Sequence, residues 1–191
     1  MRHSETEGSD KADTNKARRP LEGGLKVVKG NLKGDFFMTK RYYIAYGSNL
    51  NVEQMKHRCP DARVVGTAAL DGWTLLFKGS KTGSYLTIEP KEGESVPVAV
   101  WEVSERDELR LDRYEGYPTF YYKKDMKISY TGIASGKLRK KKAFVYIMHE
   151  DRPLGHPSDY YLKVCARGYR FFDFDINRLM QAVYDSQEDD I

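Results

Sequence analysis

With 191 residues, 40% of them hydrophobic and 13% aromatic, the chain can form one well-buried core but not two large ones. Its formal net charge is +4, yet residues 1–40 hold nine Lys or Arg against six Asp or Glu, which leaves 23 against 22 for residues 41–191. A nucleic-acid-binding domain concentrates basic residues on its folded surface to neutralise phosphates, so we expect no nucleic-acid partner.

The first twenty residues contain no Val, Ile, Leu, Phe, Trp or Tyr. Such a segment cannot bury enough apolar surface to offset the entropy lost when its backbone is ordered. Residues 21–40 remain rich in Gly and Lys, and Met38 could be an internal start or the end of an appended leader. We therefore predict a disordered or leader tail over residues 1–40, one domain over residues 41–185, and a short acidic tail over residues 186–191.

The domain is expected to open with a buried strand over residues 42–46, whose sequence is Tyr-Tyr-Ile-Ala-Tyr and which a Gly-Ser-Asn segment ends. A helix should follow, because Val52, Met55 and Cys59 repeat at helical spacing. Pro60 prevents this helix from continuing.

Further strands are expected where aliphatic and aromatic residues cluster, over residues 63–70, 73–78, 85–89 and 96–102. The Asp71-Gly72 pair between the first two is typical of a tight hairpin turn. Together these segments predict a run of antiparallel strands.

A second helix should begin after Ser104, because a serine followed three residues later by an acidic residue is typical of a helix start. Gly116 suits the left-handed position that closes a helix, which puts Glu115 at the helix end. Two more strands are expected over residues 121–129 and 141–149. Two final helices should follow, one capped by Ser158 and one marked by Ile176, Leu179, Met180, Val183 and Tyr184.

This order of elements, with one early helix, many strands and helices near the end, indicates an α+β fold. We expect a small, mostly antiparallel β-barrel, closed or nearly closed, with the helices at its periphery. No internal repeat is visible in the sequence.

The two cysteines, Cys59 and Cys165, are far apart and form no Cys-x-x-Cys pair. Neither a disulfide framework nor a thiolate zinc site is indicated, and a reducing compartment suits them. No apolar run approaches the roughly 20 residues that a membrane helix needs, and the N-terminus lacks the apolar core of a secretory signal. We therefore expect a soluble, cytoplasmic protein without a membrane partner.

The first candidate site is the strand-to-helix turn Tyr46-Gly47-Ser48-Asn49-Leu50. A glycine and small polar residues at such a junction let successive backbone N–H groups point outward, where a carboxylate or an oxyanion can dock. The alternative is an ordinary turn in which Asn49 or Asn51 caps the following helix.

Glu115 is the second candidate. At a helix C-terminus the macrodipole disfavours its negative charge, and the aromatic residues Tyr114, Tyr117 and Phe120 lower the local polarity. Both effects raise the pKa of a carboxyl group, as general acid–base catalysis near neutral pH requires. The alternative is a solvated surface glutamate next to basic neighbours such as Arg113.

The chain also holds 14 tyrosines. Phenol groups can line a small polar pocket and donate hydrogen bonds without adding charge. Most should be ordinary core residues, with one or two lining a pocket.

The segment Ala-Tyr-Gly-Ser-Asn-Leu at residues 45–50, followed some sixty-five residues later by Asp-Arg-Tyr-Glu-Gly at residues 112–116, resembles the γ-glutamyl cyclotransferase-like family, which includes the AIG2-like proteins. Residues 144–148 and 157–164 also look like the late strand and helix of its glutathione-pathway members. The resemblance spans roughly residues 41–184.

This resemblance implies a barrel-and-helix fold with a central cavity and Glu115 as the catalytic acid–base group. It implies that the backbone amides of Gly47, Ser48, Asn49 and Leu50, beside Tyr46, bind the γ-glutamyl part of a substrate. It further implies pocket tyrosines at Tyr122, Tyr146 and Tyr161, with the adjacent Tyr160 as an alternative for the last.

The reaction so implied is the cyclisation of a γ-glutamyl amine or γ-glutamyl amino acid to 5-oxoproline, without a metal or an organic cofactor. The expected partner is this small-molecule substrate, and the protein would be a monomer or a homodimer. One alternative is a non-catalytic protein of the same fold that binds a small acidic metabolite in this cavity or serves as an interaction module. Another is a nucleic-acid accessory protein that uses the tail and the basic cluster around Lys140.

Overall fold

The computed structural model describes residues 40–80 and 83–187 of the chain. Of the predicted N-terminal tail it includes only Lys40, so the expectation for residues 1–39 lies outside the described residues, as does most of the predicted acidic C-terminal tail. In the part of the chain that is described, no helix is long and apolar enough to cross a lipid bilayer.

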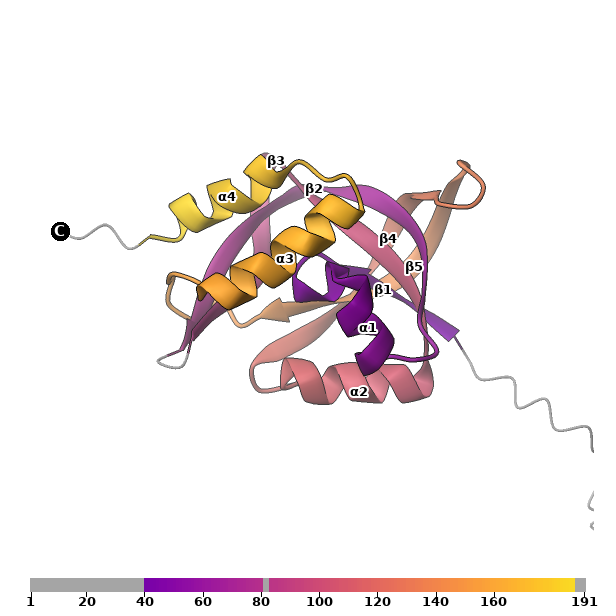
Figure 1. Cartoon of the computed structure of the whole chain (residues 1–191), viewed down its shortest axis with the longest axis horizontal. Helices are drawn as coiled ribbons and strands as arrows, with labels where there is room; N and C mark the ends of the chain where they lie inside the picture. Colours follow the sequence, from indigo (N-terminus) through magenta and orange to yellow (C-terminus); the bar gives the residue numbers. More distant parts are fainter. Residues whose placement is uncertain (1–39, 81–82, 188–191) are drawn as a thin grey trace, which may run out of the picture. The chain divides into compact units, whose positions relative to one another are not determined.

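Five strands form a closed barrel, visible at the centre of Figure 1. They join in the order β1-β3-β2-β4-β5, and neighbours are antiparallel except β1 and β5, which pair in parallel where β5 closes onto β1. The predicted α+β fold, a small and mostly antiparallel barrel with peripheral helices, is confirmed. The strands are β1 (Lys40–Ala45), β2 (Arg63–Ser80), β3 (Gly83–Ser104), β4 (Tyr121–Gly132) and β5 (Leu138–Met148).

Strands β2 and β3 form one long hairpin where four shorter strands were predicted. The turn predicted at Asp71-Gly72 is wrong, because Asp71 pairs with Ser95 and Trp73 pairs with Pro90. Gly72 is instead part of an irregularity within the ladder, and its φ of 79° is the left-handed conformation that glycine adopts without strain. A glycine suits a bulge as well as a turn, so the long-range pairing decides between them.

The helices lie outside the barrel, with α3 and α4 on one side of it and α1 and α2 on another (Figure 1). The starts predicted at Ser104 and Ser158 are confirmed, and of the alternatives Asn49 and Asn51 it is Asn51 that caps α1. Each of these three caps accepts a hydrogen bond from a backbone amide of the first turn. Gly116 closes α2 at φ 63°, as predicted. The helices are η1 (Ser48–Leu50), α1 (Val52–Arg58), α2 (Glu105–Glu115), α3 (Asp159–Phe171) and α4 (Ile176–Asp185).

Helix α3 holds η1, the short helix that carries the candidate loop, against the barrel. Gly168 of α3 lies so close to Leu50 that an added Cβ would come within 2.4 Å of the Leu50 Cβ. At the far end of α4, the buried Ser186 accepts a hydrogen bond from the Phe77 amide at 2.7 Å and donates one to the Ala182 carbonyl at 2.6 Å. The packed domain therefore extends past the predicted boundary at residue 185.

Candidate active site

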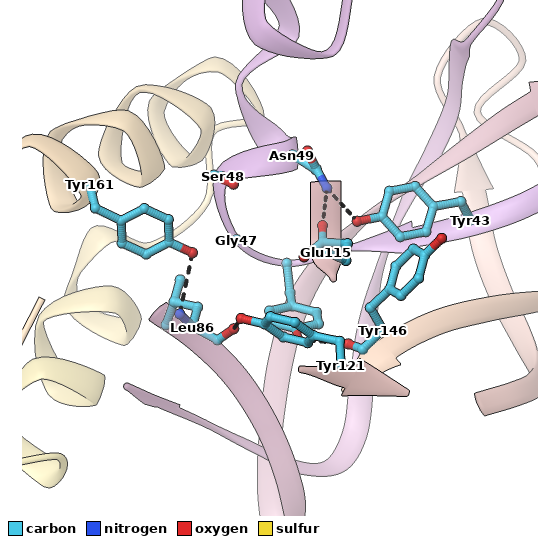
Figure 2. Close-up of a pocket in the computed structure, with 10 residues that line it drawn as sticks. Tyr43, Gly47, Ser48, Asn49, Leu86, Glu115, Tyr121, Tyr146 and Tyr161 are labelled. Carbon is cyan, nitrogen blue, oxygen red and sulfur yellow. Dashed lines mark hydrogen bonds between the residues drawn. The ribbon is translucent and has the colours of Figure 1, made fainter. Parts of the chain in front are cut away.

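One cavity gathers the candidate loop, the candidate carboxyl group and several tyrosines (Figure 2). The loop follows β1, Glu115 ends α2, and the remaining side chains come from β1, β3, β4, β5 and α3. The free volume is about 20 Å³, room for about one water molecule. Its lining consists of Tyr43, Tyr46, Gly47, Ser48, Asn49, Leu86, Glu115, Tyr121, Tyr146 and Tyr161.

The loop opens η1, so the amides of Ser48 and Asn49 precede the first amide that is bonded within this helix, that of Leu50. Gly47 forms part of the cavity wall, where an added Cβ would lie 3.3 Å from the Tyr161 hydroxyl. Asn51 caps α1, which leaves the Asn49 side chain for the cavity. The structure therefore has Asn51 as the helix cap and Gly47, Ser48 and Asn49 in the lining of the cavity, so the cap does not compete with the proposed binding role of the loop.

The structure does not support the expectation that the Leu50 amide binds substrate. This amide donates to the Gly47 carbonyl at 2.9 Å, and the Leu50 side chain is fully buried and does not line the cavity. The short helix uses its third amide internally, and the side chain anchors the loop against α3.

Glu115 reaches the cavity from the last position of α2, 66 residues away from its hydrogen-bond partner Asn49. The Asn49 side-chain amide donates to the Glu115 carboxyl group at 2.7 Å and to the Tyr43 hydroxyl at 2.8 Å. Arg58 in turn donates to the Asn49 side-chain oxygen. These contacts orient the carboxyl group toward the cavity, as Figure 2 shows.

Desolvation raises the pKa of Glu115 from its ordinary value of 4.5 to about 7, against the positive charge of Arg58 and the hydrogen bond from Asn49, which both lower it. The direction agrees with the sequence prediction, although burial dominates. A carboxyl group with a pKa near neutral pH can both accept and return a proton.

The tyrosine hydroxyl groups of the cavity differ in whether their proton is already donated within the protein. The Tyr46 hydroxyl donates to the Tyr146 backbone carbonyl at 2.7 Å, and the Tyr121 hydroxyl donates to the Leu86 carbonyl at 2.8 Å. The Tyr146 hydroxyl donates to the Asp112 carboxylate at 2.6 Å. Their oxygens can therefore only accept from a ligand. The Tyr43 and Tyr161 oxygens accept from Asn49 and from the Leu86 amide, so they keep a proton to donate.

The structure places Tyr46, Tyr146 and Tyr161 in the cavity and Tyr122 outside it. Side chains alternate along a strand, so Tyr121 takes the inward position of β4 while the Tyr122 hydroxyl donates to the Glu150 carboxylate at 2.6 Å on the other face. The expectation for Tyr122 is corrected accordingly. Tyr160 is 74% exposed, which resolves the choice in favour of Tyr161.

Three cavity residues, Tyr43, Leu86 and Tyr121, were missed by sequence reasoning. Tyr121 could have been found, since it is adjacent to the tyrosine that was chosen, and Tyr43 precedes the loop by only a few residues. No local signal marks Leu86. Among the described residues, no group of three or more His, Cys, Asp and Glu side chains is placed to hold a metal ion.

The fold and the cavity together define a small barrel protein with a polar pocket and, in that pocket, one carboxyl group of raised pKa. Residues 43–163 match the model of the family described as gamma-glutamyl cyclotransferase, AIG2-like. The chain belongs to this family.

Two similar proteins are named gamma-glutamylcyclotransferase. The human protein is 30% identical over 153 residues, 76% of each chain, and the bovine protein is 31% identical over 134 residues, 66% of this chain and 68% of that protein. Among solved structures, a human protein described as uncharacterized superposes with a TM-score of 0.65 at 25% identity, covering 80% of this chain and 90% of that one.

Proposed function

We propose that this protein is a γ-glutamylcyclotransferase, which converts a γ-glutamyl amine or γ-glutamyl amino acid to 5-oxoproline and releases the amine. Family membership and the names of the relatives support an enzyme of this type. The observation that carries the proposal is the placement of the Glu115 carboxyl group, with its pKa raised to about 7, in one cavity with the loop residues Gly47, Ser48 and Asn49.

In the proposed reaction the Glu115 carboxylate takes a proton from the substrate α-ammonium group. The freed α-amine attacks the γ-carbonyl carbon, a ring C–N bond forms, and the bond from that carbon to the leaving nitrogen breaks. Glu115 then gives its proton to the leaving nitrogen, and the second proton that the ring nitrogen must lose passes to the released amine, which departs as an ammonium ion. No water is consumed and the carboxylate is regenerated.

The attacking and accepting groups belong to one substrate molecule, so the protein has mainly to hold the chain curled. Well-aligned intramolecular reactions reach effective molarities of ~10⁵ M or more. We assign the amides of Ser48 and Asn49, with the hydroxyl protons of Tyr43 and Tyr161, to the substrate carboxylate or to the developing oxyanion. The accepting oxygens of Tyr46, Tyr121 and Tyr146 suit the substrate ammonium group. These steps require neither a metal nor an organic cofactor.

The free volume of the cavity is smaller than a glutamyl group, so binding requires the walls to move. Tyr114 is not part of the lining but contacts it through Ser48, and it is the candidate for that movement. It is 47% exposed, its hydroxyl is 3.2 Å from the Ser48 hydroxyl, and the Arg58 guanidinium lies 3.3 Å from its ring centre.

The decisive test is incubation of the purified protein with γ-glutamyl dipeptides, γ-glutamyl-ε-lysine and glutathione, followed by an assay for 5-oxoproline. Glu115→Gln should abolish product release and leave the fold intact, while Glu92→Gln, at an exposed position of β3, should not change it. Ligand-dependent melting shifts without product would favour the non-catalytic binding module. Unchanged turnover by Glu115→Gln would exclude the mechanism.

We also place the protein in the cytoplasm. Both cysteines are buried and free, which suits a reducing compartment.

A further inference from the structure

A second chamber, of about 360 Å³, adjoins the cavity and shares Ser48, Glu115, Tyr121 and Tyr161 with it. Its volume is within the range of small-molecule sites. We consider a substrate whose glutamyl end occupies the inner cavity and whose scissile bond lies at Glu115. The part of this substrate beyond the scissile bond would then extend into the second chamber, because Glu115 lines both spaces. The chamber is therefore the place to look for the leaving group.

The wall of the chamber is aromatic. Beside the shared tyrosines it includes Tyr85, Tyr114 and Phe120. Tyr85 packs edge-to-face against Phe120, with ring centres 6.1 Å apart, and against Tyr161 at 5.1 Å. These contacts fix the rings, while Tyr85 and Phe120 remain only partly buried. Such a preformed wall favours an apolar or aromatic side chain on the ligand.

One guanidinium group lies in the lining of the chamber and a second lies against one of its aromatic rings. Arg113 lines the chamber, and within residues 40–80 and 83–187 its side chain makes no hydrogen bond or ion pair, whereas its backbone carbonyl accepts from the Gly116 amide. The guanidinium of Arg152 lies 4.9 Å from the centre of the Phe120 ring and likewise has no ion pair among these residues. Glu115 is the one acidic residue in the lining. A guanidinium without a protein partner at the edge of an aromatic pocket is suited to a carboxylate.

We propose that the outer chamber binds the leaving group as an α-amino acid with an aromatic or large apolar side chain, and that Arg113 determines specificity by pairing with its carboxylate. The side chain would lie against Phe120 and Tyr85. A leaving amine that carries a positive charge and no carboxylate would instead meet two guanidinium groups. This inference rests on the proposed cyclisation for the position of the scissile bond.

Two substrates that differ only in the carboxylate test the inference, γ-glutamyl-phenylalanine and γ-glutamyl-2-phenylethylamine. Arg113 is exposed, so solvent screens its contact with a carboxylate, and the unsubstituted protein should favour the first substrate by about two- to fivefold in kcat/KM. Arg113→Gln should bring this ratio close to one, and Arg113→Lys should restore part of it. Arg170→Gln, at an exposed position of α3, should leave the ratio unchanged. A ratio near one for the unsubstituted protein, or one unaffected by Arg113→Gln, would overturn the role of Arg113.

The aromatic wall is tested separately, by comparing γ-glutamyl-phenylalanine with γ-glutamyl-glycine. Phe120→Leu should reduce the preference for the phenylalanine compound several-fold, and an equal preference in both proteins would refute the assignment of the wall. If no compound yields 5-oxoproline, the proposed reaction is refuted. Calorimetric measurement of the binding of the same compounds still tests whether the chamber binds an amino acid. Tighter binding of γ-glutamyl-phenylalanine than of its phenylethylamine counterpart, lost in Arg113→Gln, supports the site, and equal binding refutes it.

Discussion

Replacing Glu115 with glutamine should change how the stability of the protein depends on pH. A rise in pKa from 4.5 to about 7 on folding means that the folded protein binds the proton more tightly than the unfolded chain does. The stabilisation from this proton is fully present below pH 4.5 and is lost as the pH rises through 7. At about 1.4 kcal/mol per pH unit, wild-type stability should fall by about 2–3 kcal/mol between pH 5 and pH 8 because of this group alone.

Glu115→Gln lacks the ionisation and keeps a side-chain oxygen that can accept the hydrogen bond from Asn49. All other groups titrate in both proteins, so their contributions cancel in the difference. The free energy of unfolding of the variant, minus that of the wild type, should therefore increase by about 2–3 kcal/mol from pH 5 to pH 8. For a domain of this size this corresponds to about 5–10 °C in relative melting temperature.

Urea denaturation of both proteins at pH 5, 6, 7 and 8 measures this difference, and Glu92→Gln is the control for the loss of one exposed carboxyl group. The control should differ from the wild type by a constant amount over the same range. If the stability difference for Glu115→Gln is also constant, the pKa of Glu115 is not raised, and its assignment as the proton-transfer group loses its physical basis.

Arg58 lowers the pKa of Glu115, so Arg58→Gln should shift the ascending limb of the kcat/KM–pH profile to higher pH. Lys56→Gln, a control on the same helix, should not shift it. Coincident profiles for Arg58→Gln and the unsubstituted protein would contradict this coupling. Tyr121→Phe should lower both activity and stability, the latter by about 1–3 kcal/mol, because the buried Leu86 carbonyl loses its partner. Tyr122→Phe, which removes an exposed hydrogen bond, should do neither, and a reversed pattern in assays and melting curves would show that Tyr122 faces the cavity. Gly168→Ala should destabilise the protein by about 1–3 kcal/mol or more in urea titrations, because its Cβ would overlap with Leu50; unchanged stability would mean that α3 can shift away from η1.

The elements whose ends depend on local chemistry were predictable from the sequence. Ser104 and Ser158 start helices because their side chains accept amide hydrogen bonds, and Gly116 ends one because it adopts a left-handed conformation. The same local argument placed Glu115 at a helix C-terminus, and the two motifs of the family resemblance then predicted the carboxyl group and the loop as one site. The interactions concerned span three or four residues, so neighbouring side chains alone specify them.

Features that depend on distant partners were not predictable. Gly72 is compatible with a turn or with a bulge. The residues on either side of it pair with β3, and this long-range pairing makes it an irregularity within the strand. Tyr121 and Tyr122 are neighbours with the same side chain, and only the way β4 is placed in the barrel decides which of the two faces the cavity. The Leu50 amide bonds within η1 to the Gly47 carbonyl, and the Leu50 side chain packs against α3, where Gly168 permits the close approach of the two helices.

The sequence by itself determined the fold class, the helix ends and the acid–base candidate. The tertiary structure alone decided the cavity wall, the dominance of burial in raising the pKa of Glu115, and the meeting of Arg113 with Tyr85 at one outer chamber. The physical reason is that capping and backbone conformation are local energies, whereas desolvation and cavity shape arise only when segments distant in the chain exclude water from one another.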